Sequence, residues 1–264
     1  MEDEIHRAAA LLAGAKHAVA LTGAGISTPS GIPDFRSPTS GLWSRANPML
    51  VGSIWGFRLR PQAFYDWVRP LVIAFLEARP NPAHLALARL EEMDILKAVI
   101  TQNIDNLHQK AGTGRILELH GHLREATCLR CHKVVPAGGL IEKFLADGLI
   151  PRCECGGVMK PNIVFFGELL PFDVLAEAQE EARRCDLMLV AGSSLEVTPA
   201  SEIPFIAWRH GAHLIIVNYQ PTPLDSRADF VFHEDVVQIL PRLVEAVSRM
   251  KDESPPPIDL SSPS

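Results

Sequence analysis

The stretch His17-Ala-Val-Ala-Leu-Thr22, followed at once by Gly23-Ala-Gly-Ile-Ser27, indicates the fold of this 264-residue chain. Its first half is an apolar run that predicts a short buried strand, and its second half is a glycine-rich turn at the end of that strand. Glycines let a backbone approach a pyrophosphate closely, and the amides and dipole of a following helix favour negative charge. The turn is a candidate nucleotide site, although Thr28 replaces the third glycine of the dinucleotide fingerprint and no acidic residue ends a second strand. A tight strand-to-helix turn without a ligand is the alternative.

The remainder of the chain alternates between strand-like and helical patterns. Apolar runs at residues 95–100, 162–166, 187–191 and 214–218 are separated by helical stretches. Helices are also expected over residues 5–15 and, interrupted at Pro80 and Pro82, between Pro61 and Met93, whereas residues 28–47 are rich in proline and glycine and predict a long loop. Strands that alternate with helices predict an α/β fold built on a Rossmann-like parallel sheet.

Four of the five cysteines indicate a metal site. Cys128-x-x-Cys131 and Cys153-x-Cys155 form two close pairs, and Cys185 stands alone in an apolar stretch that predicts a core position. Because the count is odd and the first four residues are too acidic for a signal peptide, a secreted disulfide framework is not expected. Thiolate pairs in a reducing compartment predict the ligands of one tetrahedral zinc ion. Two unrelated reduced pairs are the alternative, since the second pair is one residue shorter than the usual spacing.

The domain organisation follows from these patterns. Residues 1–45, 95–125 and 160–250 are expected to form a discontinuous Rossmann-like nucleotide-binding domain. A smaller zinc-binding and helical domain is inserted in it, with the helical module at residues 46–94 and the zinc-binding module at residues 126–159. The prolines and serines of residues 251–264 predict a disordered tail.

Charge and composition exclude several classes of protein. Hydrophobic residues make up 47% of the chain and charged residues 21%, which is the balance of an ordinary globular protein. With 25 basic against 31 acidic residues, the chain lacks the attraction expected of a general nucleic-acid binder. No apolar run approaches the ~18 residues of a membrane span. We expect a cytoplasmic protein with no membrane and no specific nucleic-acid partner.

A basic cluster near the cysteines leaves one further class open. The cluster could belong to a zinc-ribbon module that contacts nucleic acid or a partner, although a solvated face is the preferred interpretation. It comprises Arg124, Arg130, His132, Lys133 and Arg152.

Polar or small residues follow three further predicted strands. They are Gln102-Asn-Ile-Asp105, Gly192-Ser-Ser194 and Asn218. Open α/β sheets bind ligands outside the carboxyl ends of their strands, so these residues are expected to share one site with the glycine turn. In the alternative interpretation each of these segments is an ordinary turn. Four such segments at strand ends in one chain make that interpretation less favourable.

Together these segments resemble the sirtuin family, the NAD-dependent protein deacylases. The resemblance covers about residues 5–245 in the family's order, and no single motif carries it. The matching segments are Gly23-Ala-Gly-Ile-Ser-Thr28, Gly31-Ile-Pro-Asp-Phe-Arg-Ser37, Thr101-Gln-Asn-Ile-Asp-Asn-Leu-His108, His120-Gly121, the four paired cysteines, Pro161-Asn-Ile-Val-Phe-Phe-Gly-Glu168, Gly192-Ser-Ser-Leu195 and Asn218. The resemblance implies NAD as the cofactor, a structural zinc ion, and proteins with acetylated or acylated lysine as substrates.

The resemblance implies lysine deacetylation and not hydride transfer. In the family's reaction the acyl oxygen of an acyl-lysine attacks C1′ of the nicotinamide ribose, and the products are nicotinamide, deacetylated lysine and O-acetyl-ADP-ribose. His120 matches the family's catalytic base, and an imidazole near neutral pH suits that task. Taken alone, His120 could equally be a packed structural histidine. Long-chain deacylation and mono-ADP-ribosyl transfer on the same scaffold are the alternative activities.

The remaining site residues carry over by position in the resemblance. NAD is implied to contact Gly23, Ala24, Gly25 and Thr28 with its pyrophosphate, Phe35 and Arg36 in a cofactor loop, Gln102, Asn103, Ile104 and Asp105 with its nicotinamide and ribose, and Gly192, Ser193, Ser194, Asn218 and Val236 with its adenosine half. The acyl-lysine segment is implied to add a strand along Val164, Phe166, Gly167 and Val197, with plain strand core as the alternative for Val164 and Phe166. Zinc is implied to bind Cys128, Cys131, Cys153 and Cys155, and four thiolates leave no open coordination position.

One predicted helix indicates the acyl preference. Relatives that prefer succinyl or malonyl lysine carry a Tyr and an Arg three residues apart beside the acyl pocket. Here Val68 follows Tyr65 at that spacing and Arg69 comes one residue later, a rotation of about 100° on a helix. We therefore expect an apolar acyl site and removal of acetyl or longer uncharged groups. Leu169 stands where many relatives have a polar residue that contacts the substrate backbone, so peptide binding is expected to differ.

Overall fold

The computed structural model describes residues 1–34, 41 and 47–253. In that part of the chain six parallel strands form the larger sheet, in the order β3-β2-β1-β7-β8-β9. They are β1 (Ala18–Thr22), β2 (Leu96–Thr101), β3 (Ile116–Glu118), β7 (Leu187–Ala191), β8 (His213–Val217) and β9 (Phe230–Phe232). The strand order reverses between β1 and β7, and a crevice outside the carboxyl ends of the strands forms at such a point. The predicted α/β fold with a Rossmann-like parallel sheet is confirmed.

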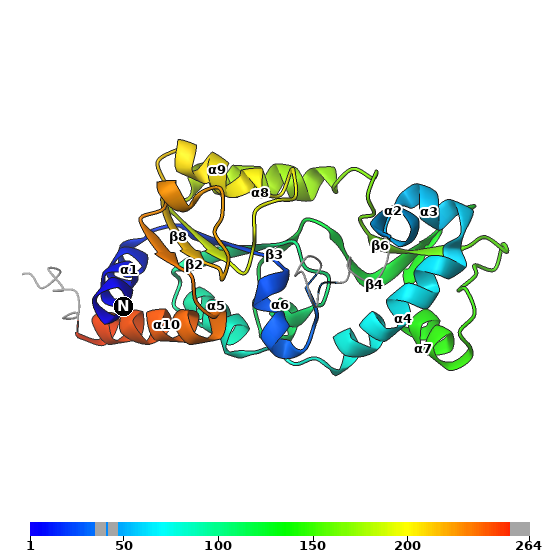
Figure 1. Ribbon diagram of the computed structural model, residues 1–264, viewed down its shortest axis with the longest axis horizontal. Coiled ribbons are helices and arrows are strands. Elements are labelled where there is room, and N and C mark those ends of the chain that lie inside the picture. The colour runs from blue at the N-terminus through cyan, green and yellow to red at the C-terminus, as the bar shows by residue number, and fades with distance from the viewer. Residues whose placement is uncertain (35–40, 42–46, 254–264) are drawn as a thin grey trace, which may run out of the picture.

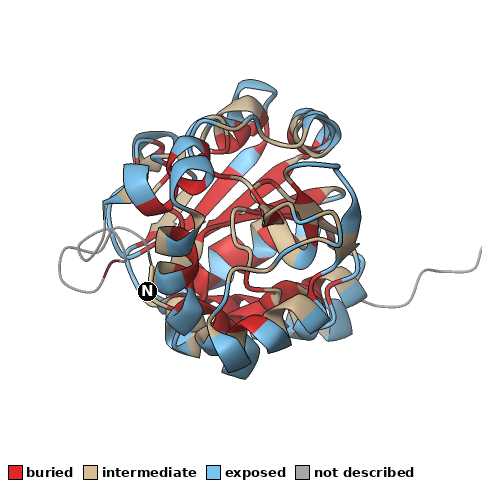
Figure 2. Ribbon diagram, turned by 90° about the vertical axis from the view of Figure 1, so that its right-hand side faces the viewer, coloured by how far each residue is buried: buried red, intermediate tan, exposed pale blue. Residues whose placement is uncertain are grey.

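Helices cover both faces of this sheet (Figure 1). One face carries α1 (Glu2–Gly14), α5 (Pro82–Glu92) and α10 (Val236–Glu253), and the other carries α8 (Phe172–Arg184) and α9 (Glu202–Arg209). Every residue of β1 and of β7 is buried, as strands covered on both faces require. Figure 2 shows this buried interior enclosed by helices whose outer surfaces are exposed. In α1 the buried residues Ile5, Ala8, Ala9 and Leu12 recur at helical spacing, which explains why this segment packs as a helix.

A second, smaller unit lies beside the carboxyl ends of the parallel strands (Figure 1). Among the described residues its antiparallel sheet has the order β5-β4-β6, with β4 (Gly121–Cys128), β5 (Val134–Pro136) and β6 (Met159–Ile163). The helices of this region are α2 (Pro48–Val51), α3 (Ile54–Leu59), α4 (Pro61–Glu77) and α7 (Gly138–Asp147), while α6 (Leu107–Lys110) follows β2 and packs against α5. Its core is aromatic: the Phe57, Phe64 and Phe165 rings lie 5.0–5.3 Å apart, centre to centre.

Two local predictions differ from the structure. The strand predicted over residues 162–166 is β6 at Met159–Ile163 instead, and it pairs with β4 in the small sheet, not with the parallel strands. The apolar run placed the predicted strand too late in the chain, because Phe165 is buried in the aromatic core and Phe166 lies in an extended segment bridged to Ser53. Between the glycine turn and residue 34 the chain forms only single 3₁₀ turns, at Ala24–Ile26 and Thr28–Ser30. The expectation that the dipole of a following helix favours an anion at this turn is therefore wrong.

Within the described ranges, no helix is long and apolar enough to cross a membrane.

Candidate active site

A cavity of about 660 Å³ runs along the carboxyl edge of the parallel sheet. This volume falls within the range of small-molecule sites. Its walls come from the ends of β1, β2, β7 and β8, from the segment after β6, and from one side of α4. Its lining includes these residues selected from the sequence: Gly23, Ala24, Gly25, Thr28, Gln102, Asn103, Ile104, Asp105, His120, Val164, Phe166, Gly167, Gly192, Ser193, Ser194, Val197, Asn218 and Val236. Phe35 and Arg36 lie outside the described residues.

The glycine turn packs directly against the turn after β7. The Gly25 amide donates to the Gly192 carbonyl at 2.8 Å, and a Cβ at Gly25 would lie 2.9 Å from Gly192 Cα. Gly192 itself has φ +62°, the left-handed region that favours glycine. Glycine is thus required here for contact between two strand ends. The amides of Gly23, Gly25, Ile26 and Ser27 already donate to protein carbonyls, so an anion would depend on neighbours outside this set, such as Ala24 and Thr28.

A buried polar network lies beneath the glycine turn. Ser27 Oγ donates to Asp105 Oδ2 at 2.6 Å, and the Leu107 amide donates to Asp105 Oδ1 at 2.9 Å. Asn103 Nδ2 donates to both the Gly23 carbonyl and Ser27 Oγ. Burial raises the pKa of the Asp105 carboxyl, while the Ser27 hydroxyl and the Leu107 amide oppose that rise. Asp105 is therefore a preorganised acceptor whose side chain borders the cavity.

Two buried histidines support this network, and sequence reasoning missed both. His84 and His108 are 0% and 1% exposed, and their rings lie 5.0 Å apart. His84 Nε2 lies 3.4 Å from Ser27 Oγ, and His108 Nε2 lies 2.9 Å from Thr22 Oγ1. Burial lowers the pKa of His84 to about 4 and that of His108 to about 3, so both rings are neutral near pH 7. His108 stood within a quoted segment, but no local pattern distinguished either ring from an ordinary core residue.

His120 follows β3 and lies half-buried at the cavity wall. Its Nδ1 is 2.9 Å from the Gln102 carbonyl. Because a carbonyl oxygen only accepts, Nδ1 carries the proton, and in the neutral ring Nε2 is the basic nitrogen. Gln102 Nε2 donates in turn to Ser193 Oγ, and the His120 carbonyl accepts the Val164 amide at 2.9 Å. His120 is thus held through its ring by Gln102 after β2 and through its backbone carbonyl by Val164 after β6.

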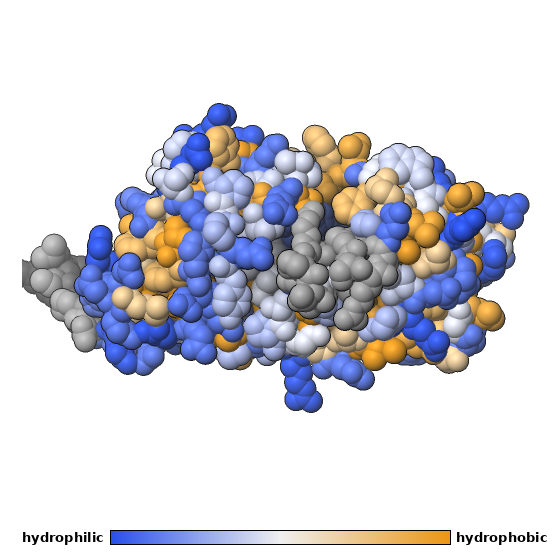
Figure 3. All heavy atoms as spheres, viewed as in Figure 1, coloured by the Kyte–Doolittle hydropathy of each residue, from blue (hydrophilic) through white to orange (hydrophobic). Residues whose placement is uncertain are grey.

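The segment after β6 forms another wall of the cavity. The Phe166 amide donates to the Gly52 carbonyl, and the Phe166 carbonyl accepts the Ile54 amide. The Trp55 ring lies against Gly167, where a Cβ would approach it to 2.1 Å. Leu169 and Phe172 are 93% and 81% exposed at the cavity rim, and Figure 3 shows apolar surface beside the start of α8.

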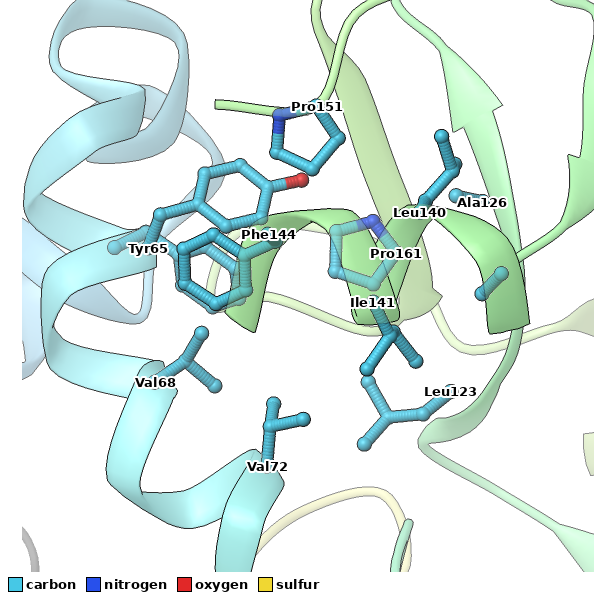
Figure 4. Close-up of a pocket in the computed structure, with 12 residues that line it drawn as sticks. Tyr65, Val68, Val72, Leu123, Ala126, Leu140, Ile141, Phe144, Pro151 and Pro161 are labelled. Carbon is cyan, nitrogen blue, oxygen red and sulfur yellow. The ribbon is translucent and has the colours of Figure 1, made fainter. Parts of the chain in front are cut away.

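Apolar residues of α4 close the far end of the cavity. They are Phe64, Trp67, Val68, Leu71 and Phe75. A second cavity of about 40 Å³ shares Phe64 and Val68 with the first and lies between α4, α7 and the small sheet. In Figure 4, Tyr65, Val68 and Val72 extend from α4 toward Ile141 and Phe144.

Two other side chains of α4, those of Tyr65 and Arg69, do not line the large cavity. Tyr65 lines the small cavity, and its hydroxyl donates to the Met159 carbonyl at 2.7 Å. Arg69 is exposed and donates to the Leu145 carbonyl. The expectation that Arg69 misses the pocket agrees with this placement, but Tyr65 does not border the large cavity either.

The four paired cysteines gather into one cluster. All four sulfur atoms lie within 4.8 Å of one another, with Cys128 3.5 Å from Cys155 and Cys131 3.7 Å from Cys153. Sulfur atoms placed tetrahedrally about 2.3 Å from zinc are about 3.8 Å apart, so these residues fit a zinc ion. Gly157 makes room for the short Cys153-x-Cys155 turn, since a Cβ there would lie 2.6 Å from Cys128 Sγ. None of the four cysteines lines the large cavity.

Comparisons with known proteins agree with this geometry. The family model described as "Sir2 family" matches residues 23–199. The chain is 50% identical to an NAD-dependent protein deacylase 2 of Archaeoglobus fulgidus, over 96% of this chain and 100% of that protein. It is 46% identical to an NAD-dependent protein deacetylase of Sulfurisphaera tokodaii, over 90% of this chain and 93% of that protein.

Two solved structures with bound peptides are also similar. A structure of Sir2Af2 bound to a myristoylated histone peptide has a TM-score of 0.83 and 46% identity, covering 96% of this chain and 100% of that one. A structure described as Sir2–p53 peptide–NAD+ has a TM-score of 0.84 and 44% identity, covering 92% of this chain and 98% of that one.

Proposed function

The chain belongs to the Sir2 family, and from that premise we propose that it is an NAD-dependent protein-lysine deacetylase. The relatives' activities support the reaction class. The observation that carries the proposal is the convergence of His120, the buried Asp105 carboxyl and the glycine turn on one cavity of about 660 Å³. When bound there, NAD supplies a ribose carbon that releases nicotinamide and accepts the acyl oxygen. The products are nicotinamide, deacetylated lysine and O-acetyl-ADP-ribose.

Asp105 is proposed to hold the nicotinamide end. A carboxylate accepts hydrogen bonds, so it can take N–H bonds from a carboxamide. Ser27 and the Leu107 amide fix its orientation from the protein side. Gln102, Asn103 and Ile104 complete this part of the site.

The other parts of NAD are proposed to bind at the neighbouring strand ends. The Ala24 and Thr28 amides would receive the pyrophosphate. The residues Gly192, Ser193, Ser194, Asn218 and Val236 would contact the adenosine half.

His120 is proposed to remove a proton from a ribose hydroxyl. Its Nδ1–H bond to the Gln102 carbonyl orients the ring and leaves Nε2 to accept that proton. The same bond stabilises the imidazolium that results, because Gln102 keeps its acceptor in place. The imidazolium would give that proton to the lysine amine as it leaves, which restores the neutral ring.

The acyl-lysine segment is proposed to lie along Val164, Phe166 and Gly167, with Val197 on the opposite side. Phe166 is already bonded on one edge to Gly52 and Ile54, which holds this segment extended. The acyl group would enter toward the apolar wall of α4, where Phe64 and Val68 carry no charge. Among the described residues no lysine or arginine lines the cavity to pair with a succinyl carboxylate.

Long-chain deacylation is a second candidate, and one observation favours it. The small cavity shares Phe64 and Val68 with the large one and is lined by apolar residues. A flexible chain that displaced those side chains would extend into it. A relative of known structure binds a myristoylated histone peptide.

Zinc is proposed to stabilise the small sheet without taking part in the reaction. Four thiolates fill a tetrahedral site, and the cluster is outside the cavity wall. Four clustered thiols also support a reducing compartment, and we propose the cytoplasm.

The proposed reaction is tested with one peptide carrying acetyl, myristoyl or succinyl lysine. Mass spectrometry would follow nicotinamide, ADP-ribose adducts and the peptide with NAD present. We expect nicotinamide release that depends on the acetyl peptide and forms O-acetyl-ADP-ribose in equal amount. ADP-ribose attached to protein without loss of acetyl groups would instead indicate mono-ADP-ribosyl transfer. No peptide-dependent release would contradict the proposal.

A further inference from the structure

A partly buried ion pair braces the segment that follows β6. Lys160 Nζ lies 3.0 Å from Glu168 Oε2, and the two side chains are 12% and 26% exposed. The same ammonium donates to the Ile163 carbonyl at 2.8 Å and lies 4.6 Å from the centre of the Phe165 ring. Glu168 Oε2 also accepts the Phe165 amide at 2.9 Å. The pair therefore closes a loop around residues 163–168.

The enclosed residues are those assigned to the substrate. Val164, Phe166 and Gly167 all line the large cavity. The Val164 amide is bonded to the carbonyl of His120, so the position of this segment is coupled to the proposed base. A substrate that adds a strand needs a backbone presented in one conformation, because each of its hydrogen bonds depends on that geometry.

The chemistry of the ion pair suits a role in orienting residues 163–168 better than a role in filling space in the core. Burial lowers the pKa of Lys160, and Glu168 opposes that change. A buried ion pair generally adds little net stability compared with apolar side chains of similar volume. The ammonium instead supplies three donors, which here reach the Pro161 and Ile163 carbonyls and the Glu168 carboxylate. An apolar side chain could fill this space but could not hold those three oxygens.

We propose that the Lys160–Glu168 ion pair is a positioning device that holds residues 163–168 in the conformation that binds the acyl-lysine segment. This role rests on the proposed function. Glu168 lines the cavity but Lys160 does not, so Lys160 acts through the segment and not by touching substrate. Loss of the pair should weaken peptide binding and leave NAD binding unchanged.

The test uses Lys160→Met, Lys160→Arg, Glu168→Gln and the double variant Lys160→Met/Glu168→Gln. In steady-state assays with an acetyl-lysine peptide, Lys160→Met should raise the peptide KM about tenfold, with kcat within about threefold of wild type. The KM for NAD should not change. Lys160→Arg keeps the charge and should restore the peptide KM to within about twofold of wild type. The double variant should be no worse than Lys160→Met, because both changes remove one interaction.

Lys97→Met is the matched control. Lys97 Nζ also bonds a carbonyl and a carboxylate, both of Asp94, but at the opposite end of the sheet. An equal rise of the peptide KM in Lys97→Met, or an unchanged KM in Lys160→Met, would overturn the proposal. If Lys160→Met does not fold, Glu168→Gln carries the test through the exchange of the Val164 and Phe166 amides, because its amide oxygen still accepts the Phe165 amide. Its peptide KM is not used, since Glu168 itself lines the cavity.

Hydrogen exchange separates this role from the proposed function. The Val164 and Phe166 amides should exchange faster in Lys160→Met than in wild type, whether or not the enzyme turns over the peptide. If the wild-type protein shows no NAD-dependent deacetylation but exchange is still faster in Lys160→Met, the positioning role of the ion pair is supported and the proposed function is contradicted. Unchanged exchange of these amides in Lys160→Met would refute the positioning role of the ion pair.

Discussion

Acidification should destabilise this protein through its two buried histidines. His84 and His108 keep folded-state pKa values of about 4 and about 3, because burial penalises the charged ring. In the unfolded chain each takes its ordinary value of about 6.5. A folded pKa below the unfolded one means that the stabilisation is fully present above about pH 6.5 and is lost as the pH falls toward the folded values.

The magnitude follows from proton uptake by the unfolded chain. Between pH 7.5 and 5.5 each unfolded histidine gains most of a proton while its folded counterpart stays neutral, which costs about 1.3 kcal/mol each. The free energy of unfolding should therefore fall by about 2.5 kcal/mol over that range from these two residues. Because His84 bonds Ser27, which bonds Asp105, protonation would also disturb the proposed nicotinamide pocket.

Urea unfolding at pH 7.5, 6.5 and 5.5 measures this change. The His84→Gln/His108→Gln variant should lose less than about 1 kcal/mol over the same range, whatever its stability at pH 7.5. His210→Gln, at an exposed position, controls for the loss of a histidine as such. If the double variant is too unstable, NMR titration of the two wild-type rings replaces it. Rings that titrate near pH 6.5, or a double variant with the full wild-type slope, would refute the reasoning.

Four further predictions test the site. His120→Ala should reduce deacetylation about 100-fold or more while calorimetry shows NAD binding within about threefold of wild type, and parallel loss of both would argue against a base. Removal of metal by a chelator should lower activity and the thermal midpoint together, whereas activity restored by a cation that leaves the midpoint low would contradict a structural zinc. Succinyl peptides should react more slowly than acetyl peptides, because Arg69 is bonded to Leu145 away from the large cavity; a succinyl preference would overturn this. Leu169→Asn should raise the KM about threefold for peptides in which large apolar residues flank the acyl-lysine, but not for peptides in which glycines flank it. Leu59→Asn is the control, because Leu59 is exposed but does not line the cavity, and it should change the KM of neither kind of peptide.

The positions of strand ends could be predicted because they follow from simple sequence patterns. Buried parallel strands are nearly continuous apolar runs, and the small or polar residues after them meet at one edge of the sheet. The predicted runs at residues 17–22, 95–100, 187–191 and 214–218 are β1, β2, β7 and β8 of the larger sheet, with ends that agree to within one residue. The run at residues 162–166 gave a wrong strand prediction for the same reason. A run is equally apolar when its side chains fill a separate aromatic core, as Phe165 does.

The support of the site could not be predicted from local patterns. Ser27, His84 and Asp105 are far apart in the chain, and no spacing rule connects a serine to a histidine 57 residues later. The Lys160–Glu168 pair shows the same limit, because lysine and glutamate are common on surfaces and only burial makes this pair specific. The 3₁₀ turns after Gly23 also depend on tertiary packing, since Gly25 and Gly192 must touch.

The sequence by itself determined the alternation of strands and helices, the small residues at the strand ends and the four thiols, since each depends on residue type and short spacing. The tertiary structure alone decided which side chains are buried together and therefore how each is charged. A carboxyl or an imidazole has one intrinsic affinity for protons in water, and its affinity in the protein depends on neighbours that other segments bring to it. Asp105, His84 and His108 have their properties for this reason.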